Sequence, residues 1–419
     1  MEKTKIMICT DHAQRTGFGN VAHNVAVGLA ENNFNVFYLG WGFHADTPLP
    51  RNNYLLLPTG QAPFGEDVLP HWIQSIKPEV LITQADTRML MSYPNILKQI
   101  PNKPTWVFYV VIDGVTWDFE GKYNHWPTNW TQCIKAADKV VAMTKYGQDI
   151  LKANGIDSTV IYHGVDTLHY TPVSDEIKRK IKAGAGLAED VFIFGGVFKN
   201  MQRKCPEKYL QAFKIFLESL PDSQKDKVAL LFHTNPQPGP SGEFDLVQHC
   251  IDYGLVPGKN VVFSTQALPA EMMPMIYQTM DVFLHLGTME GFGLPIIEAM
   301  SCGIPIVGVD SCTMPELIGD CGLLSDVPKY VKNHKISFGS YNGVECDLVD
   351  PWDVAKKMTK LYESEALRKE LGFKATEKAI KTFDWQIIRK QWTDFVKSLV
   401  IDESKIPEEW QKLYNETKV

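Results

Sequence analysis

Short runs of β-branched and aromatic residues alternate with helix-length amphipathic segments along the first half of the chain. Lys5–Thr10 predicts a strand, Gly19–Glu31 predicts a helix whose apolar residues recur every three or four positions, and Asn35–Leu39 predicts a second strand. This alternation is typical of a parallel sheet covered by helices. Four more strands and one helix are expected in this half, at Val80–Thr83, Thr105–Val111, Lys139–Met143 and Ser158–Tyr162, and at Tyr146–Asn154.

The same alternation restarts after a polar segment between Asp166 and Ala188, which we interpret as an inter-domain linker. The second half predicts strands at Val191–Val197, Val228–His233, Val261–Ser264, Val282–Leu286 and Ile304–Val309, and helices at Pro206–Ser219, Pro269–Thr279 and Pro295–Ser301. An irregular surface loop is expected at Lys329–Glu345, and the chain then ends in helices. The pattern therefore predicts two Rossmann-like α/β domains, over residues 1–185 and 186–384.

Composition places the chain among folded globular proteins. Of its 419 residues 44% are hydrophobic and 22% are charged, which excludes a disordered, collagen-like or coiled-coil chain. The longest apolar runs, such as Trp106–Ile112, fall far short of the roughly 18 residues that a membrane-spanning helix needs. The first residues also lack the apolar core and cleavage site of a secretory signal, so we expect a cytosolic protein.

Charge and cysteine usage narrow the functional classes. The net charge is −7, yet the first 185 residues carry 17 basic and 17 acidic side chains, so the acidic excess lies in the rest of the chain. This balance disfavours broad binding to nucleic-acid backbones. A neutral first half suits an acceptor domain that touches anionic surfaces, and a solvated surface explains it equally well. The eight cysteines include no C-x-x-C pair and no zinc-ligand spacing, so we expect reduced packing residues.

The segment Glu290–Gly303 carries the strongest chemical signal. Pro295 suits the first turn of a helix and Gly303 its end, so Glu290 belongs to the preceding loop and Glu298 to the helix. Glycines in the loop let backbone N–H groups approach a ligand, and the helix N-terminus favours an anion such as a diphosphate. The alternative is an ordinary strand–turn–helix with two solvated acids.

This string resembles the E-x7-E motif of retaining GT-B glycosyltransferases, specifically glycosyltransferase family 4 and its relatives, the glycosyl transferases group 1. The resemblance implies that Glu290 contacts hydroxyls of the donor sugar and that Glu298 contacts the ribose of the nucleotide. It also places beside the donor the loop residues Gly291, Phe292, Gly293 and Leu294. The implied fold has two facing Rossmann-like domains and a C-terminal helix, from about residue 385 to 419, that crosses back to the first domain.

Three basic residues upstream look like the family segment that clasps the donor diphosphate. Lys199 stands where an Arg is common, Lys204 stands where the family has Lys, and Arg203 lies between them. Cations in a closed cleft offset the negative charge that gathers on the leaving nucleoside diphosphate. We therefore expect Lys199, Lys204 and Glu290 to be catalytic, Arg203 to bind the donor, and catalysis to need neither cofactor nor metal. A solvated basic loop is the alternative.

The segment Thr16–Ala22 satisfies the G-x-G-x-x-A pattern and opens a predicted helix. One interpretation is a dinucleotide fingerprint, which would make the chain an NAD-dependent oxidoreductase. Six residues separate the strand from the first glycine, however, and no acid ends the second strand, which weakens that interpretation. In the resembling family a glycine-rich loop here faces the cleft, so Gly17 and Gly19 are expected to bind the donor. Glycines that only form a turn are the alternative.

Two acids follow predicted strands of the first half. Strand ends face the crevice of an open α/β sheet, and many relatives place a His or Asp near the sugar's anomeric carbon at the position of Asp113. Asp113 is therefore expected to orient the donor sugar or the acceptor hydroxyl, with the capping of a turn as the alternative. Asp86 either meets the acceptor or caps a helix. His163 and Asp166 match another family signature, and we expect them to fix the hinge through backbone hydrogen bonds.

Loops after two strands of the second half are expected to touch the nucleotide. By the same resemblance, Thr265 and Leu268 lie against the base. His233 and His285 are expected to be satisfied core or rim histidines, because no metal-ligand spacing appears.

The resemblance as a whole predicts a retaining hexosyltransferase whose donor is a nucleoside-diphosphate sugar such as a UDP- or GDP-hexose. The expected mechanism is a same-face displacement in which the leaving phosphate helps to deprotonate the acceptor. The resemblance does not choose the acceptor, which could be a lipid-linked sugar, a polysaccharide, a protein or a modified base. A cytosolic enzyme that contacts the inner membrane surface is compatible with this prediction. An oxidoreductase and a non-catalytic sugar-nucleotide binder remain the alternative functions.

Overall fold

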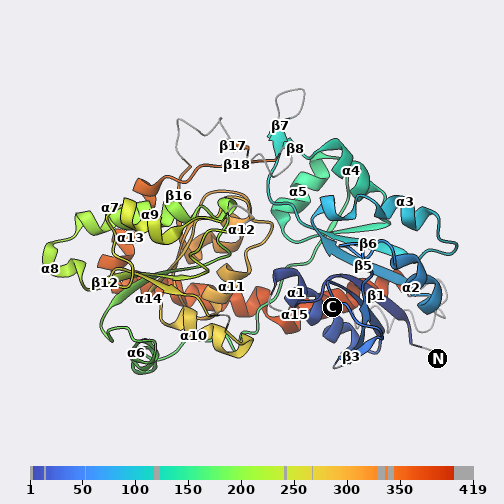
Figure 1. The fold of residues 1–419 in the computed structure, drawn as a ribbon, viewed down its shortest axis with the longest axis horizontal. Coiled ribbons are helices and arrows are strands. Elements are labelled where there is room, and N and C mark those ends of the chain that lie inside the picture. The colour runs from blue at the N-terminus through green and yellow to red at the C-terminus, as the bar shows by residue number, and fades with distance from the viewer. Residues whose placement is uncertain are drawn as a thin grey trace, which may run out of the picture.

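Two separate sheets, one in each half of the chain, organise the fold (Figure 1). The structure is a computed structural model that describes residues 3–13, 16–51, 53–117, 123–239, 243–266, 268–327, 336–337 and 344–400. Helices flank both sheets, so the predicted pair of Rossmann-like α/β domains is confirmed.

The first sheet has eight strands in the order β10-β9-β6-β5-β1-β2-β4-β3, and only the edge pair β3 and β4 is antiparallel. The strands are β1 Lys5–Asp11, β2 Asn35–Trp41, β3 Leu49–Arg51, β4 Tyr54–Pro58, β5 Val80–Ala85, β6 Thr105–Val110, β9 Lys139–Ala142 and β10 Thr159–Val160. The helices of this half are α1 Gly17–Glu31, α2 Leu69–Ile76, α3 Tyr93–Lys98, α4 Thr128–Lys135, α5 Lys145–Ala153 and the 3-10 turn η1 Thr87–Leu90. A small hairpin pairs β7 Thr116–Trp117 with β8 Tyr123–His125.

The second sheet has six parallel strands in the order β13-β12-β11-β14-β15-β16. The strands are β11 Phe192–Val197, β12 Val228–His233, β13 Val261–Ser264, β14 Val282–His285, β15 Ile306–Val309 and β16 Gly322–Ser325. The helices are α7 Pro206–Ser219, α8 Asp222–Lys225, α9 Leu246–Asp252, α10 Met273–Gln278, α11 Leu294–Ser301, α12 Met314–Ile318, α13 Pro351–Glu363 and α14 Glu365–Lys378. Single turns are η2 Gln202–Lys204, η3 Ala270–Met272, η4 Gly319–Cys321 and the π-helical η5 Ala379–Phe383.

The segment interpreted as a linker contains a helix, α6 (Asp175–Gly184), which corrects that prediction in part. The hydroxyl of Ser174 accepts a hydrogen bond from an N–H of the first turn, which caps the helix. Lys178 and Lys182 then pair with Asp281 of the second domain, at 2.7 and 3.0 Å. Two basic side chains of this polar segment therefore anchor the helix to the second domain.

Two other predictions of local structure changed. The helix expected at Pro269–Thr279 is divided into η3 and α10, because Pro274 lacks the N–H that a continuous helix would use and sits instead in the first turn of α10. The loop expected at Lys329–Glu345 lies mostly outside the described residues. The described residues of this segment include β17 (Ile336–Ser337), which pairs with β18 (Glu345–Cys346).

The C-terminal helix crosses back to the first domain, as expected. In Figure 1 the red α15 (Trp385–Val400) lies beside the blue α1. Arg389 of α15 donates to Asn24 Oδ1 at 2.7 Å, and the backbone N–H of Val165 donates to the carbonyl of Phe383 at 2.8 Å. The part of the predicted helix at 401–419 lies outside the described residues. Strand pairing of β1 and packing of α15 therefore place both of these elements in the first domain.

A carboxylate from the second domain also reaches the first. Glu316 in α12 accepts hydrogen bonds from the backbone N–H groups of Lys145 and Tyr146 at 2.8 and 2.9 Å, and from the hydroxyl of Tyr162 at 2.7 Å. These two N–H groups belong to the N-terminus of α5, where a negative charge is favourable. The contact holds the two domains together on one side of the space between their sheets.

Two further predictions, on the state of the cysteines and on membrane-spanning helices, concern both domains. Seven cysteines of the described chain are free thiols, and six of them are buried, which confirms their packing role. Among the described residues, no helix combines the length and the apolar character required to cross a bilayer.

Candidate active site

A cleft between the domains lies at the carboxyl ends of their parallel strands. The first domain contributes Thr16, Gly17 and Asn20 at the start of α1. The second domain contributes the loops after β11, β12 and β13 and the start of α11. The structure brings to this cleft six of the predicted site residues, namely Gly17, Lys199, Thr265, Leu268, Leu294 and Glu298.

The N-termini of two helices meet in this cleft. The side chain of Thr16 caps α1, and α11 begins at Leu294 with a proline in its first turn. A Cβ atom added at Gly17 would lie 3.5 Å from Cδ1 of Leu294, so the two helix starts approach each other across the domains. Exposed N–H groups at helix N-termini favour phosphate groups. The cleft therefore suits an anionic nucleotide.

Glu298 lies in α11 at the wall of the cleft. Its carboxylate accepts a hydrogen bond from the hydroxyl of Tyr277. Burial raises the pKa of Glu298 to about 7, although the hydrogen bond from Tyr277 opposes this shift. The carboxyl group is therefore close to half-ionised at neutral pH in the free protein. Sequence analysis missed Tyr277, because nothing in its position in the chain relates it to a residue 21 places later.

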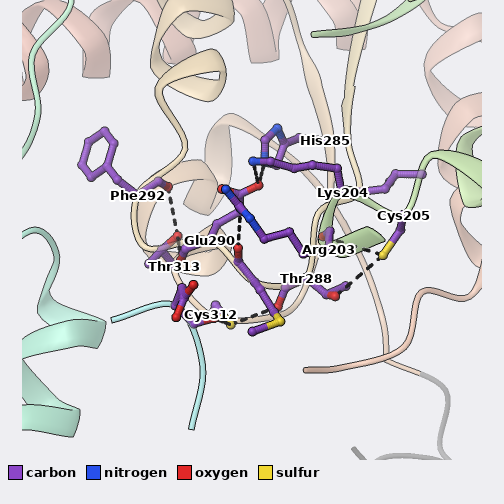
Figure 2. A network of polar contacts seen from close by, with 12 residues as sticks. Arg203, Lys204, Cys205, His285, Thr288, Glu290, Phe292, Cys312 and Thr313 are labelled. Atoms are coloured by element: carbon purple, nitrogen blue, oxygen red, sulfur yellow. Dashed lines mark hydrogen bonds and ion pairs between the residues drawn. The ribbon is translucent and has the colours of Figure 1, made fainter. Parts of the chain in front are cut away.

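Glu290 is the centre of a buried ionic network (Figure 2). Its Oε1 contacts Lys204 Nζ and lies 3.2 Å from His285 Nε2, while its Oε2 lies 3.2 Å from Arg203 Nη1. Arg203 also donates to the carbonyl of Met289 at 2.8 Å. The structure thus brings together three of the residues predicted from two distant segments of sequence.

The charges in this network shift one another's pKa values. Burial opposes ionisation of Glu290, but Lys204 and Arg203 outweigh it and hold the pKa of Glu290 well below its ordinary value. Burial and the neighbouring Arg203 lower the pKa of Lys204 to about 8, against the opposing effect of Glu290. Burial also lowers the pKa of His285, so its imidazole is neutral at pH 7. The network therefore carries a net positive charge near neutral pH.

Local packing fixes the loop that carries Glu290. The hydroxyl of Thr313 donates to the carbonyl oxygens of Glu290 and Phe292, at 3.2 and 3.0 Å. Gly293 has a φ of 107°, a conformation that L side chains rarely adopt. A Cβ atom added at Gly291 would lie 2.4 Å from Val111 Cγ1 of the first domain. Glycine at 291 is therefore required where the loop meets the end of β6.

Two residues expected beside the donor, Gly19 and Phe292, make close packing contacts. Gly19 does not line the cleft, and a Cβ atom there would lie 2.1 Å from the carbonyl oxygen of Ala13. Phe292 is buried against the His163 ring, with ring centroids 4.5 Å apart, and does not line the cleft. Close backbone approach explains the glycine, and the contact between domains explains the aromatic residue.

The three basic residues do not gather at one point. Arg203 and Lys204 belong to η2 and reach Glu290, whereas Lys199 is exposed and lines the cleft that also contains Glu298. Cys205, which follows them, has a φ of 51° and lets the chain turn from η2 into α7. The turn directs the two inner cations back toward the strand ends.

Asp113 lies in a different cavity, on the first domain. This cavity is lined by Asp86, Thr87, Arg88, Val111, Asp113, Trp126, Trp130 and Val344. Burial, followed by the negative charge of Asp86, raises the pKa of Asp113 to about 7, while Arg203 opposes the shift. Asp113 thus interacts electrostatically with the Glu290 network although it does not line the donor cleft.

The remaining predicted residues have structural contacts. Asp166 Oδ1 accepts hydrogen bonds from the N–H groups of Leu168 and His169, both at 3.1 Å, which agrees with the prediction. The prediction that His163 forms a backbone hydrogen bond was wrong, because Nδ1 of His163 lies 2.7 Å from the side-chain hydroxyl of Tyr109. His233 Nδ1 lies 3.0 Å from Ser264 Oγ at the rim of the cleft.

His285 is a buried histidine with a hydrogen-bond partner, as expected, and that partner belongs to the Glu290 network. It is 1% exposed and ends β14, five residues before Glu290, and it contacts the carboxylate. Its position at a strand end was a signal that sequence analysis could have used. Thr313, Trp126 and Trp130 gave no comparable signal.

Comparisons with known proteins agree with this architecture. Residues 178–378 match the family model of glycosyl transferases group 1. The chain superposes on a sucrose-phosphate synthase from Thermosynechococcus elongatus with a TM-score of 0.72 at 17% identity, over 95% of this chain and 99% of that one. It superposes on Anabaena HepE, solved with UDP and glucose, with a TM-score of 0.67 at 17% identity, over 95% of this chain and 100% of that one.

Curated relatives match over shorter stretches. The chain is 24% identical over 280 residues to a D-inositol 3-phosphate glycosyltransferase from Corynebacterium kroppenstedtii, covering 64% of this chain and 55% of that enzyme. It is 46% identical over 59 residues to the O-antigen chain mannosyltransferase B of Escherichia coli, covering 14% of this chain and 16% of that enzyme. These matches therefore span about half or less of the relatives.

The fold and these similarities define the class: the chain has the two-domain fold of the GT-B glycosyltransferases. Within that class, residues 178–378 belong to the glycosyl transferases group 1, the family whose model they match. The interpretation of Thr16–Ala22 as the fingerprint of an oxidoreductase gains no support from either comparison.

Proposed function

We propose that this protein transfers a hexose from a nucleoside-diphosphate sugar to an acceptor hydroxyl with retention of configuration. The observation that carries the proposal is the buried network in which Glu290 pairs with Lys204 and Arg203, in the same domain that supplies Glu298 to the lining of the cleft. The reported complexes of Anabaena HepE with UDP, glucose and UDP-glucose support a nucleotide-sugar donor.

The proposed donor extends along the cleft. Glu298 accepts hydrogen bonds from the ribose, and Thr265 and Leu268 contact the base. The diphosphate lies between the helix N-termini and the cations Lys204 and Arg203, with Lys199 on its outer side. Glu290 contacts hydroxyls of the hexose. These roles are supported by the lining of the cleft, which includes Thr265, Leu268 and Glu298, and by the ion pairs of Glu290 with Lys204 and Arg203.

The chemical step follows from the charges. As the glycosidic bond breaks, both bonding electrons leave with the nucleoside diphosphate, and Lys204 and Arg203 stabilise the charge that develops on it. The acceptor oxygen then bonds to the anomeric carbon from the same face. Its proton passes to an oxygen of the departing diphosphate. Closed domains exclude water that would otherwise hydrolyse the donor.

The donor is tested with a panel of UDP-, GDP- and ADP-hexoses. One of these is expected to raise the thermal midpoint of unfolding and to release its nucleoside diphosphate when acceptor is present. NAD serves as the control ligand. If NAD stabilises the protein and none of the nucleotide sugars does, the proposed function is wrong. If a nucleotide sugar raises the thermal midpoint but no transfer to acceptor occurs, the protein is a non-catalytic sugar-nucleotide binder.

Metal independence is part of the proposal. Because Lys204 and Arg203 supply positive charge beside the proposed diphosphate, EDTA is expected to leave the initial rate of transfer unchanged. The measurement is release of nucleoside diphosphate before and after chelation. A loss of activity that Mg²⁺ or Mn²⁺ restores would contradict this expectation.

Donor binding is expected to tighten as the pH rises from 6 to 7.5. The carboxylate of Glu298 accepts ribose hydroxyls best when ionised, and the pKa of Glu298 in the free protein is about 7. Because the folded pKa is raised, the proton bound below pH 7 must be released on binding, which changes the dissociation constant by about eightfold over this range. Titration calorimetry with the nucleotide sugar measures this change, and the Glu298→Gln variant should give a flat profile. Equal slopes in both proteins would remove Glu298 from the donor site.

A further inference from the structure

His285 is a buried titratable residue that the proposed mechanism does not use. It is 1% exposed, and its Nε2 lies 3.2 Å from Oε1 of Glu290 (Figure 2). Its other ring nitrogen, Nδ1, has no hydrogen-bond partner among the described residues. A buried nitrogen without a partner costs free energy that an apolar side chain would avoid. A histidine at this position is therefore explained by what its Nε2 does for Glu290.

The contact with Glu290 determines which ring nitrogen carries the hydrogen. Burial lowers the pKa of His285, although the hydrogen bond to Glu290 opposes this shift. The charges of Lys204 and Arg203 add to the lowering. The imidazole is therefore neutral at pH 7, and only one of its nitrogens bears a hydrogen. Because a carboxylate only accepts hydrogen bonds, that hydrogen lies on Nε2, and His285 donates to Glu290 without carrying a charge.

The side chains that pair with the Glu290 carboxylate differ in rigidity. Lys204 and Arg203 reach it with long side chains from η2, a single 3-10 turn. His285 ends β14, an interior strand of the second sheet that is paired with β11 on one side and β15 on the other. Side chains are held more precisely on a strand than on a loop. His285 is therefore the partner best suited to fix the position of the carboxylate.

The same side chains also differ in how a bound donor would affect them. A diphosphate attracts the ammonium group of Lys204 and the guanidinium of Arg203. Both cations pair with Glu290 in the free protein, so a donor bound as proposed draws them away from that carboxylate. The uncharged imidazole of His285 offers no charge for the diphosphate to attract, and it stays on Oε1. A buried carboxylate left without any hydrogen-bond donor would be costly.

We propose that His285 is a positioning residue for sugar transfer. Its Nε2–H group holds Oε1 of Glu290 in place while the donor diphosphate draws Lys204 and Arg203 from this carboxylate. Glu290 therefore meets the hydroxyls of the hexose in one fixed position. This inference rests on the proposed function, and it adds a residue that acts only through Glu290.

Two variants of His285 test this role. Leucine removes the hydrogen-bond donor, whereas glutamine carries an N–H at the same place along its side chain as Nε2. In His285→Leu, kcat should fall about tenfold or more, as for a lost hydrogen bond to a charged group, while the dissociation constant of the nucleotide sugar should stay within about threefold of wild type. His285→Gln should recover most of the lost rate. His71→Leu, an exposed change in α2, is the control and should match wild type.

Release of nucleoside diphosphate gives kcat, and titration calorimetry gives the dissociation constant. A folded His285→Leu protein with the kcat of wild type would overturn the inference. Equal losses in the leucine and glutamine variants would do so too, because they would reflect packing rather than the hydrogen bond. In the Glu290→Gln background, His285→Leu should change kcat by less than about twofold, since the two residues act as one unit. An undiminished effect in that background would show that His285 does not act through Glu290.

A spectroscopic measurement on wild-type protein keeps the inference testable if His285→Leu does not fold. Nitrogen-15 labelling of the histidines, with His285→Gln to assign the resonances, shows by NMR which ring nitrogen bears the hydrogen. The neutral Nε2–H form is expected at pH 7 both without and with saturating nucleotide sugar. A hydrogen on Nδ1, or on both nitrogens, in the nucleotide-sugar complex would overturn the inference. Binding of nucleotide sugars without any turnover would instead contradict the proposed function, and the spectrum would still decide whether His285 holds Glu290.

Discussion

Replacing Lys204 by Met is expected to lower the rate of sugar transfer by about a hundredfold or more. The ammonium group is nearly buried, with 9% of the residue exposed, and lies against Glu290 at the strand ends of the second domain. Removing it takes away a charge contact that strengthens as the diphosphate leaves. Because the contact grows in the transition state, kcat should fall more than the donor affinity.

The measurement is the initial rate of nucleoside diphosphate release, together with donor affinity from calorimetry. Lys227→Met is the matched control, because the side chain of Lys227 is exposed and lies outside both cavities. Its rate should equal that of wild type. A Lys204→Met protein that folds and keeps a near-normal rate would remove Lys204 from the catalytic site.

The Glu290→Gln variant is expected to lose both activity and stability. Transfer should fall by about a hundredfold, because the carboxylate no longer holds the two cations and the sugar hydroxyls. The free energy of unfolding should fall by about 3 kcal/mol, since Lys204 and Arg203 are left without their buried counter-charge. Urea unfolding at pH 7 measures this loss, and Glu363→Gln, an exposed change elsewhere in the second domain, is the control.

The change of the free energy of unfolding with pH shows whether the ionised carboxylate of Glu290 stabilises the fold. The folded state holds the pKa of Glu290 well below the value of 4.5 expected in the unfolded chain. The stabilisation is therefore fully present above about pH 4.5 and is lost as the pH falls toward the folded pKa. Glu290→Gln should lack this part of the acid-induced loss. An identical acid profile in both proteins would contradict the electrostatic role.

The double variant Glu290→Gln, Lys204→Met separates stability from catalysis. Removing both charges eliminates one unpaired buried ion, so the double variant should be more stable than Glu290→Gln alone. Its transfer rate should remain as low as that of the single variants. Recovery of activity together with stability would indicate that the network is needed only for folding.

The sequence identified the residues of the cleft and of the Glu290 network more fully than those of the cavity beside Asp113. The E-x7-E spacing selected Glu290 and Glu298, and the basic string after the strand at 191–197 selected Arg203 and Lys204. The cavity beside Asp113 had no comparable motif, because Asp86 and Asp113 come from separate strands and its tryptophans lie near and within α4. Asp86 and Asp113 were singled out only from their positions after strands.

Some contacts were not visible in the sequence. Gly19 and Phe292 were expected at the donor, and the structure adds a close backbone approach at Gly19 and a ring contact between the domains at Phe292. The polar segment that contains α6 was interpreted as a linker, and Asp281, about 100 residues later, pairs with two of its lysines. No local pattern records such distant partners.

By itself, the sequence determined the α/β class, most strands and helices, and the family. Those features depend on local periodicity, turn residues and a motif of fixed spacing, as in Pro206–Ser219, where the predicted helix matches the observed one. Only the tertiary structure decided that Lys204 meets Glu290, that Tyr277 meets Glu298, and that Thr87 and Trp126 share a cavity. Such contacts form when strands far apart in the chain align their carboxyl ends, and burial then sets their charges and pKa values.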